Sequence, residues 1–512
     1  MASFIKNHRI MLLILLASLL IHSVLVPYAK FENETVRDLT ITDRMLEQKE
    51  IRLQGLVSEI GEDGTQQSFG PLFYYLLTFS QIIWHHPYSV FILISVITAV
   101  AGFLTYLLVD KYYNRKAAII ASTLFMFNPW VFVFISLNIA NPSFLLPFIV
   151  LLYYSLHKII IDNNDKYIIG VGIALAASLQ LHLSSLLLIP ITFLILIILR
   201  PRVFVSKYFL VGLAMSVVFF LPYLIYNATH HTFSETTDFI FGERASVSRL
   251  ENLRDSIGIP FMLATTFFGH YLLGSTEVFE SSSIKNLFIA IDIFIGILII
   301  IQIFILLYQL RFQTTKEQKK TLLLLAWFIL PILFAIIPGA NVSPHYLYLT
   351  YSSQFILLAL LFTSQKHQSI KKIALGVILA AYILYLIAFF SLLHSYGGTN
   401  GLYGTPIGTK INLLKTINEE FPEGHLAFYN YVKPEYAYLQ SYYAHHLTLI
   451  PHSNIQEGMR GYLILDFVSH GNFGEQHIPL EDIAIIKTLP SSSLCPLTLI
   501  SLQDYVKAFP KC

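Results

Sequence analysis

The sequence has few charged residues, few tryptophans and almost no cysteine. Charged residues make up 12% of the 512 residues, whereas 55% are hydrophobic. This balance excludes a water-soluble globular protein, in which about a quarter of the residues are charged. The net charge of +2 gives no indication of a nucleic-acid partner. The two cysteines, Cys495 and Cys512, exclude a disulfide scaffold but leave open a single bridge in an oxidising compartment.

Long apolar runs take the place of the missing charges. Runs of about 17 to 25 apolar residues are long enough to cross a bilayer as helices. We therefore predict an α-helical polytopic membrane protein with about eleven transmembrane helices. The first run follows Lys6 and Arg9 and has no convincing signal-peptidase site, so we interpret it as a retained span. The predicted spans are 10–29, 87–109, 117–136, 143–161, 167–183, 184–200, 208–227, 286–310, 321–338, 346–364 and 373–394.

The charges between these spans predict the orientation. A cytoplasmic N-terminus puts 17 of the 33 basic residues into short inner connections, as the positive-inside rule requires. The same topology places 26 of the 31 acidic residues on the outer side, in loop 30–68, in loop 228–285 and after residue 395. We therefore expect the protein to act at the outer face of the membrane.

Two domains are predicted, a transmembrane module over 1–395 and an outer part over 396–512. In the first, the run 69–84 is interpreted as a helix in the membrane interface, with interfacial structure up to residue 86. The alternative that this run dips into the bilayer and returns stays open. In the second, a Gly- and Thr-rich linker leads to runs such as INLLKTINEEF and GYLILDFV, which predict a small α/β domain of about 100 residues.

Loop 30–68 contains nine of the acidic residues in a chain that is otherwise poor in charge. Glu34 and Asp38 are four residues apart, with Arg37 between them, so a helix starting here would place both carboxylates on one face. A carboxylate near the membrane plane can accept a proton from a substrate hydroxyl or amine. The alternative is that these charges only solvate the loop, and their spacing does not separate the two interpretations.

Several motifs follow one another along the chain. ETVRD at 34–38 is followed by FGPLFYYLL, and later by FNPWVF, ASLQLHLSS, FFLPYLIYN, SPHYLYL and GGTNGLYGTP. In this order and spacing they resemble a bacterial group of polytopic GT-C glycosyltransferases, related to the dolichyl-phosphate-mannose protein mannosyltransferases and the aminoarabinose transferases. In that group an acidic motif follows the first span, and a Gly-Pro-Leu-Tyr-Tyr motif precedes the second.

The resemblance implies an inverting glycosyltransferase of the bacterial cytoplasmic membrane. Its donor would be a sugar on a polyprenyl monophosphate, and its acceptor a lipid, glycan or protein on the outer side. Glu34 matches the family's first acidic position, usually Asp, and is expected to be the general base or a carboxylate that orients the acceptor. Because Glu is one methylene longer than Asp, the catalytic role can instead belong to Asp38 or to Glu32.

The resemblance also implies six residues that bind substrate, namely Arg37, Tyr74, Tyr75, His182, His345 and Tyr346. Of these, Arg37, His345 and Tyr346 are expected at the departing phosphate, which needs positive or hydrogen-bond-donating groups. Two alternatives stay open. His345 and Tyr346 can anchor a span at the membrane interface, and His182 can be a hydrogen-bonded residue at a helix end.

The sequence identifies no metal site, because its histidine pairs are adjacent rather than spaced for ligation. An ion held by Glu34 and the donor phosphate stays open. Two other functions do as well. A ligase or polymerase using a polyprenyl pyrophosphate would use outer-loop arginines, such as Arg244, Arg249 and Arg254. A transporter or flippase without chemistry would bury paired charges at mid-membrane, whereas Asp292 is the only acidic residue that we place within a span.

Overall fold

The computed structural model of the chain is mostly helical. Arg244, Cys495, Cys512 and most of loop 228–285 lie outside the residues that it describes. Those residues are 2–59, 66–230, 249–265, 282–336, 343–396, 403–420, 425–428, 434–444, 446–451, 461–466, 487–488 and 497–501.

By its packing, the chain forms two compact units. Unit 1 contains most of the apolar helices, and unit 2 combines the start of the first loop with the C-terminal part of the chain. The ranges of unit 1 are Met1–Ser23, Ile41–Phe268 and Phe288–Ile383, and those of unit 2 are Val24–Thr40, Gly269–Leu287 and Leu384–Cys512.

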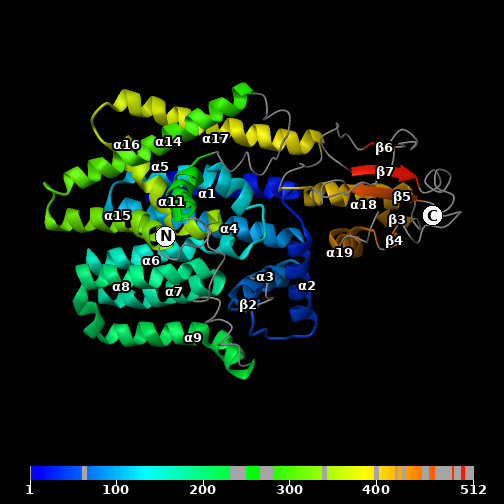
Figure 1. The fold of residues 1–512 in the computed structure, drawn as a ribbon, viewed down its shortest axis with the longest axis horizontal. Coiled ribbons are helices and arrows are strands. Elements are labelled where there is room, and N and C mark those ends of the chain that lie inside the picture. The colour runs from blue at the N-terminus through cyan, green and yellow to red at the C-terminus, as the bar shows by residue number, and fades with distance from the viewer. Residues whose placement is uncertain are drawn as a thin grey trace. The chain divides into compact units, whose positions relative to one another are not determined.

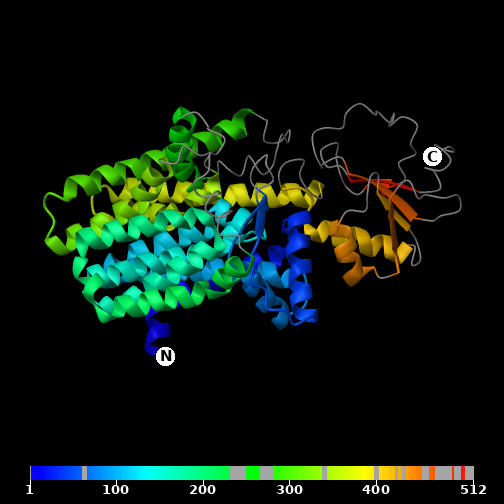
Figure 2. The ribbon, with the colours of Figure 1, turned by 60° about the horizontal axis from the view of Figure 1, so that its bottom comes forward.

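Each of the eleven predicted spans coincides with helical structure. The main helices are α1 (Ala2–Leu25), α4 (Tyr88–Tyr112), α5 (Arg115–Phe127), α6 (Leu146–Ile160), α7 (Ile168–Leu181), α8 (Leu188–Leu199), α9 (Lys207–His230), α11 (Arg249–Leu263), α14 (Ser282–Gln309), α15 (Thr315–Ile336), α16 (Tyr351–Thr363) and α17 (Gln368–Tyr396). Within unit 1, α7 packs against both α6 and α9 (Figures 1 and 2).

Eight helical segments of the described residues are long and apolar enough to cross a membrane. The three predicted spans that fall short of this length coincide with α5, α7 and α8. These helices are short because other structure interrupts them: a π-helix follows α5 at Trp130–Ile135, and 3-10 turns at Asp165–Tyr167 and Leu183–Leu187 flank α7. The protein is therefore a multi-pass membrane protein.

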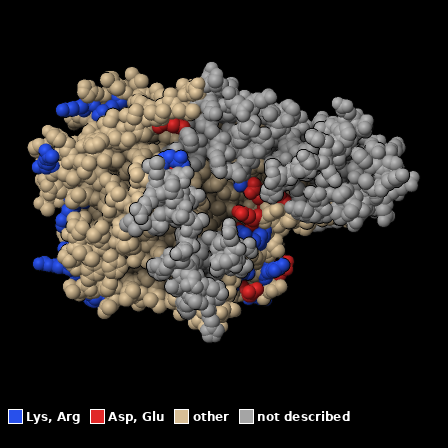
Figure 3. Space-filling model, in the orientation of Figure 1, with Lys and Arg blue, Asp and Glu red and all other residues tan. Residues whose placement is uncertain are grey.

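Figure 3 shows Lys and Arg side chains along one edge of unit 1, beside a wide uncharged area.

The first predicted outer loop folds into α2 (Asn33–Glu47), a hairpin of β1 (Val57–Glu59) and β2 (Gln66–Ser68), and α3 (Leu72–Ile83). Helix α3 begins after Pro71, a residue that favours helix starts. At 12 residues it is too short to span a bilayer. The prediction of a separate, non-spanning helix after residue 69 is confirmed, and its place in the interface stays a prediction.

The FNPW sequence at 127–130 forms a buried polar network in unit 1. The Asn128 side-chain oxygen accepts hydrogen bonds from the Trp130 amide at 2.9 Å and from the Tyr351 hydroxyl at 2.5 Å. The Trp130 indole donates to the Tyr348 hydroxyl at 3.0 Å. Because an unsatisfied polar group inside a membrane protein costs several kcal/mol, this network holds the end of α5 against the start of α16.

The strands and helices predicted after residue 410 are present in unit 2. Helix α18 (Ile407–Glu420) covers the INLLKTINEE run, and β5 (Gly461–Asp466) covers GYLILD. The five-stranded sheet has the order β4-β3-β5-β7-β6. Strand β3 is parallel to its neighbours β4 and β5, and strand β7 is antiparallel to its neighbours β5 and β6. A separate domain beginning at residue 396 stays a prediction. The remaining elements are β3 (His425–Phe428), α19 (Pro434–Tyr443), β4 (Thr448–Pro451), β6 (Lys487–Thr488) and β7 (Leu497–Ser501).

Candidate functional site

The acidic residues at the start of α2 differ in their access to solvent. The Glu32 carbonyl accepts a hydrogen bond from the Val36 amide at 3.0 Å, so the first helical turn starts at Glu32. The Glu32 carboxylate pairs with the Lys30 ammonium at 2.9 Å and is 41% exposed. Glu34, in the first turn of the helix, is also exposed. Both carboxylates can therefore be reached by a substrate.

Asp38 occupies a different environment on the same helix. Its side chain is buried, and it accepts a hydrogen bond from the Arg37 guanidinium at 2.9 Å. Helix α2 does carry both Glu34 and Asp38, as the spacing of the two residues allowed. The buried and paired position of Asp38 suits a supporting role better than proton transfer to a substrate, which needs direct contact with the reacting group.

Tyr403 lies beside the same acidic residues in unit 2. Its hydroxyl donates to the Tyr28 carbonyl at 2.6 Å. Burial raises the pKa of the Tyr403 phenol, and the charge of Glu32 raises this pKa further. Tyr403 therefore stays a neutral hydrogen-bond donor at all physiological pH values. Tyrosine at 403 was not singled out from the sequence, although it falls within the GGTNGLYGTP run that carries the resemblance.

In unit 1, the predicted tyrosines hold an arginine that the sequence did not single out. The Arg52 guanidinium lies over the Tyr74 ring, 5.2 Å from its centroid, and the Tyr75 hydroxyl donates to the Arg52 carbonyl at 2.5 Å. Burial raises the pKa of the Tyr75 phenol, so it remains a donor. Among the described residues, no carboxylate forms an ion pair with Arg52.

Arg52 is therefore a partly buried cation whose charge no carboxylate of the described residues neutralises in an ion pair. The flat guanidinium presents several donors in a geometry that matches phosphate oxygens. Its Nε atom donates to the Gln54 carbonyl at 3.0 Å, which fixes one edge of the group. In the sequence, Arg52 could have been noticed as a basic residue in a loop dominated by acidic residues.

A second cluster of unit 1 brings together residues predicted from distant parts of the chain. The His182 ring lies 5.0 Å from the His345 ring and 5.4 Å from the Tyr346 ring. Phe69, the first residue of the FGPLFYYLL motif, stacks on the His182 ring, with ring centroids 6.2 Å apart. His182 is 6% exposed, whereas His345 and Tyr346 are partly exposed. The structure thus joins three of the six predicted substrate-binding residues.

The His182 ring has a defined hydrogen-bonding role. Its Nδ1 atom accepts a hydrogen bond from the Ser184 amide at 3.2 Å, at the start of the 3-10 turn after α7. In the neutral ring, Nε2 then carries the proton and is a donor. The interpretation of His182 as a helix-end histidine is confirmed, and it does not exclude contact with a substrate.

Close packing explains the glycine before α3. A Cβ atom at Gly70 would lie 2.3 Å from Cγ of Gln180, so only glycine fits there. Gln180 itself donates to the Phe219 carbonyl at 2.8 Å, and Asn141 donates to the Leu181 carbonyl at 2.6 Å. Four segments therefore meet around the end of α7: the FGPLFYY, LQLH and FFLP sequences and the residue Asn141. Their contacts position His182, which directly follows this helix.

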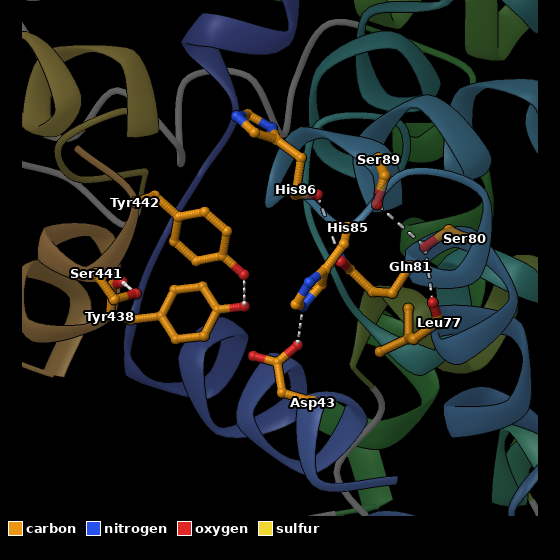
Figure 4. Close-up of polar contacts among 10 residues, drawn as sticks. All are labelled: Asp43, Leu77, Ser80, Gln81, His85, His86, Ser89, Tyr438, Ser441 and Tyr442. Carbon is orange, nitrogen blue, oxygen red and sulfur yellow. Dashed lines mark hydrogen bonds and ion pairs between the residues drawn. The ribbon is translucent and has the colours of Figure 1, made fainter. Parts of the chain in front are cut away.

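A hydrogen bond between side chains joins the second half of α2 to the turn after α3. Nε2 of His85 lies 3.1 Å from a carboxylate oxygen of Asp43 (Figure 4). In the same turn, Gln81 donates to the His86 carbonyl and the Ser89 hydroxyl donates to Ser80. These contacts fix the connection from α3 to α4. In unit 2, Figure 4 also shows the paired hydroxyls of two tyrosines on α19, Tyr438 and Tyr442.

The described residues contain no group of three or more His, Cys, Asp or Glu side chains arranged to hold a metal ion. The carboxylates at the start of α2 and the cation of Arg52 belong to different compact units. In chemical terms, the first group consists of carboxylates, which can accept a proton, and the second is a guanidinium, which carries a positive charge.

Comparisons with known proteins agree with these features. Residues 68–226 match the sequence profile of the family described as dolichyl-phosphate-mannose-protein mannosyltransferase. No curated protein sequence matches the chain significantly.

Solved structures extend the likeness beyond the matched segment. The apo structure of ArnT from Cupriavidus metallidurans matches with a TM-score of 0.52 and 10% identity, over 90% of this chain and 93% of ArnT. The structure of the same protein bound to undecaprenyl phosphate gives 0.53 and 8% identity, over 97% and 98%. The chain is thus similar to the GT-C mannosyltransferase and aminoarabinose transferase group, in sequence over residues 68–226 and in fold over nearly its whole length.

Proposed function

We propose that the protein is a membrane glycosyltransferase that moves a sugar from a polyprenyl monophosphate to an acceptor outside the cytoplasmic membrane. The observation that carries the proposal is the pair of solvent-accessible carboxylates, Glu32 and Glu34, at the start of α2 in a chain with the ArnT fold. ArnT is similar over nearly the whole chain and has been solved with undecaprenyl phosphate, which supports a lipid phosphate as the donor carrier.

The proposed reaction is a single displacement at the anomeric carbon. The acceptor oxygen or nitrogen forms a bond to this carbon while the bond to the lipid phosphate oxygen breaks. Glu34 takes the proton from the acceptor, and Glu32 is the alternative base because it is also exposed. The departing lipid phosphate keeps the bonding electron pair, and the configuration of the sugar is inverted.

Arg52 is the proposed site for the donor phosphate. It is a cation without a carboxylate partner among the described residues; the Tyr74 ring lies under its guanidinium, and the Tyr75 hydroxyl holds its backbone carbonyl. A guanidinium fixed before the reaction stabilises the charge that develops on the leaving phosphate. Arg37, by contrast, donates to Asp38, so we assign it a supporting role. His182, with His345 and Tyr346 around it, is proposed to donate hydrogen bonds to the sugar or the acceptor.

The test uses purified protein in liposomes with polyprenyl monophosphate donors that carry a hexose, pentose or amino sugar. Mass spectrometry of envelope lipids, glycans and proteins added as acceptors measures the mass increment. We expect transfer by the wild type and a loss of at least about a hundredfold for Glu34→Gln, since a general base contributes about that much. The control is Glu47→Gln, which makes the same change at an exposed position near the end of α2.

Three outcomes distinguish the alternatives. Full transfer by Glu34→Gln together with loss in Glu32→Gln moves the base to Glu32 and keeps the function. Transfer only from pyrophosphate carriers would replace the proposal by a ligase or polymerase. Movement of the lipid-linked sugar across the membrane without a covalent product would replace it by a transporter.

A further inference from the structure

We propose that the segment Tyr403–Lys410 positions the carboxylates at the start of α2, with Lys410 as the main positioning residue. This inference rests on the transferase function proposed above and adds a distant part of the chain to its site. All the residues that carry it belong to unit 2. Its basis is a series of contacts from 403–410 to the residues that lead into α2.

Hydrogen bonds hold the chain on its way into α2. The Tyr403 hydroxyl donates to the Tyr28 carbonyl at 2.6 Å, and the Ile407 amide donates to the Ala29 carbonyl at 2.9 Å. Both acceptors are backbone atoms, so the bonds fix the path of the chain rather than a side chain. A buried backbone carbonyl without such a partner would cost about as much as a lost hydrogen bond.

Lys410 extends this series with a buried charge. Its ammonium donates to the Phe31 carbonyl at 2.7 Å and lies 3.3 Å from a carboxylate oxygen of Glu435. Lys410 is 5% exposed, and its ammonium lies 5.6 Å from the centre of the Tyr436 ring. Burying an ion pair seldom adds stability compared with apolar residues of similar size. The geometry therefore points to a role in fixing the position of Phe31, the residue directly before Glu32.

Two glycines allow the segment to approach so closely. A Cβ atom at Gly408 would lie 2.6 Å from the carbonyl oxygen of Pro27, closer than real Cβ contacts. Gly404 has a φ of 70°, a conformation that favours glycine, and a Cβ atom there would lie 3.5 Å from a carboxylate oxygen of Glu32. An antiparallel bridge between Lys30 and Pro406 lies between these two contacts.

The held residues determine where α2 starts. The Glu32 carbonyl accepts the first helical hydrogen bond, from Val36. A shift of residues 28–31 would therefore move Glu32 and the first turn with Glu34. A displacement of about 1 Å at a catalytic group can lower the rate about a hundredfold, so a distant positioning segment can control the reaction without touching the substrate.

The test compares Lys410→Met with the double variant Lys410→Met/Glu435→Gln. The double variant removes both charges, so it does not leave a lone buried carboxylate. Three quantities are measured for full-length protein in liposomes: kcat for transfer, KM for the lipid donor, and the rate of amide hydrogen exchange of residues 28–36. We expect both variants to lower kcat at least about tenfold with little change in KM, and to speed exchange over 28–36 at least about tenfold.

Two further variants serve as controls. Lys415→Met makes the same change at an exposed position on α18, where the ammonium only lies over the Tyr443 ring. Glu435→Gln keeps the bond from Lys410 to the Phe31 carbonyl. Both controls should retain kcat and the slow exchange of residues 28–36.

The outcomes separate this proposal from the transferase proposal. A folded double variant with wild-type kcat and unchanged exchange would overturn the positioning role. Lys410 would then be needed only to neutralise the buried charge of Glu435. If the wild type transfers no sugar from any carrier, the transferase proposal fails. In that case exchange decides the positioning role alone: faster exchange over 28–36 supports it, and unchanged exchange overturns it.

Discussion

The rings of His182 and His345 lie edge to face, with centroids 5.0 Å apart and planes at 88°. One follows α7, and the other lies in the 3-10 turn of Pro344–Thr350 before α16. Since the Nδ1 atom of His182 accepts the Ser184 amide, the opposite nitrogen, Nε2, carries the proton of the neutral ring. The pair thus places two donor-capable rings from separate helices at one point.

Replacing His182 tests that donor. His182→Phe keeps a ring that can pack against Phe69 and His345 but removes both ring nitrogens. We expect transfer to fall at least about tenfold while the melting temperature in detergent changes little, because the packing is retained. Sugar transfer and thermal unfolding of the same preparation provide the measurement. Unchanged transfer at wild-type protein levels would assign His182 a purely structural role.

Arg52 should control affinity for the donor phosphate. A hydrogen bond to a charged group contributes about 1.5 to 3 kcal/mol, so Arg52→Gln is expected to raise KM for the donor about tenfold to a hundredfold. Arg52→Lys, which keeps the charge but loses the planar set of donors, should lie between Gln and wild type. The control is Arg44→Gln, an exposed arginine in the last turn of α2. Equal donor KM for Arg52→Gln and wild type would remove Arg52 from the phosphate site.

The contact between α7 and α9 depends on two glycines. A Cβ atom at Gly172 would lie 2.5 Å from the Gly212 carbonyl oxygen, a backbone atom that cannot move aside. We expect Gly172→Ala to lower the melting temperature by several degrees, since overpacking costs about 1 to 3 kcal/mol. Gly376→Ala on α17 is the control, because nothing lies within 4 Å of its added Cβ. This control should leave the melting temperature equal or slightly higher. Equal melting temperatures for the two variants would contradict the close packing.

Asp162 joins the ends of α4 and α6 and makes stability depend on pH. Its carboxylate accepts from the Lys111 ammonium at 2.7 Å and the Tyr112 hydroxyl at 3.0 Å, and it lies 3.5 Å from the Lys158 ammonium. Burial alone would raise the pKa of Asp162, but the bonds and charges of these partners outweigh it and hold the pKa below its ordinary value of 3.8.

The sign of the effect follows from that direction. A carboxyl group with a lowered pKa in the folded state stabilises above the unfolded pKa, and this contribution is lost as the pH falls through the folded pKa. The difference in melting temperature between wild type and Asp162→Asn should be constant from about pH 5 to 8 and should shrink below about pH 4. Thermal unfolding in detergent at a series of pH values checks this. A difference that grows toward low pH would contradict the ion cluster.

Helix α3 should lie in the membrane interface. Phe79, Ile82, Ile83 and Trp84 are exposed, and the first three recur at helical spacing. Trp84 can be observed alone after Trp130→Phe and Trp327→Phe. In liposomes we expect its fluorescence to be quenched more by lipids brominated near the headgroup than by lipids brominated at the chain end. Stronger quenching from the chain end would favour the re-entrant alternative.

The sequence by itself determined which segments are helices in the membrane. Long apolar runs must satisfy their backbone groups internally, so helices follow from composition and length alone. The short helix α3 was also predictable, because proline and aromatic residues mark its ends, whereas the spacing of Glu34 and Asp38 allowed helix α2 without requiring it. The strands after residue 410 followed from short apolar runs such as GYLILD.

Only the tertiary structure decided which side chains meet. The sequence shows Arg52 only as a basic residue in an acidic loop, and its contacts with the two tyrosines of α3 became visible only in the fold. The burial of Asp38 and the contacts of Lys410 with Phe31 likewise depend on packing between segments far apart in sequence. Local preferences act over a few residues, whereas these contacts form only when long loops close, which a single sequence does not encode in any one pattern.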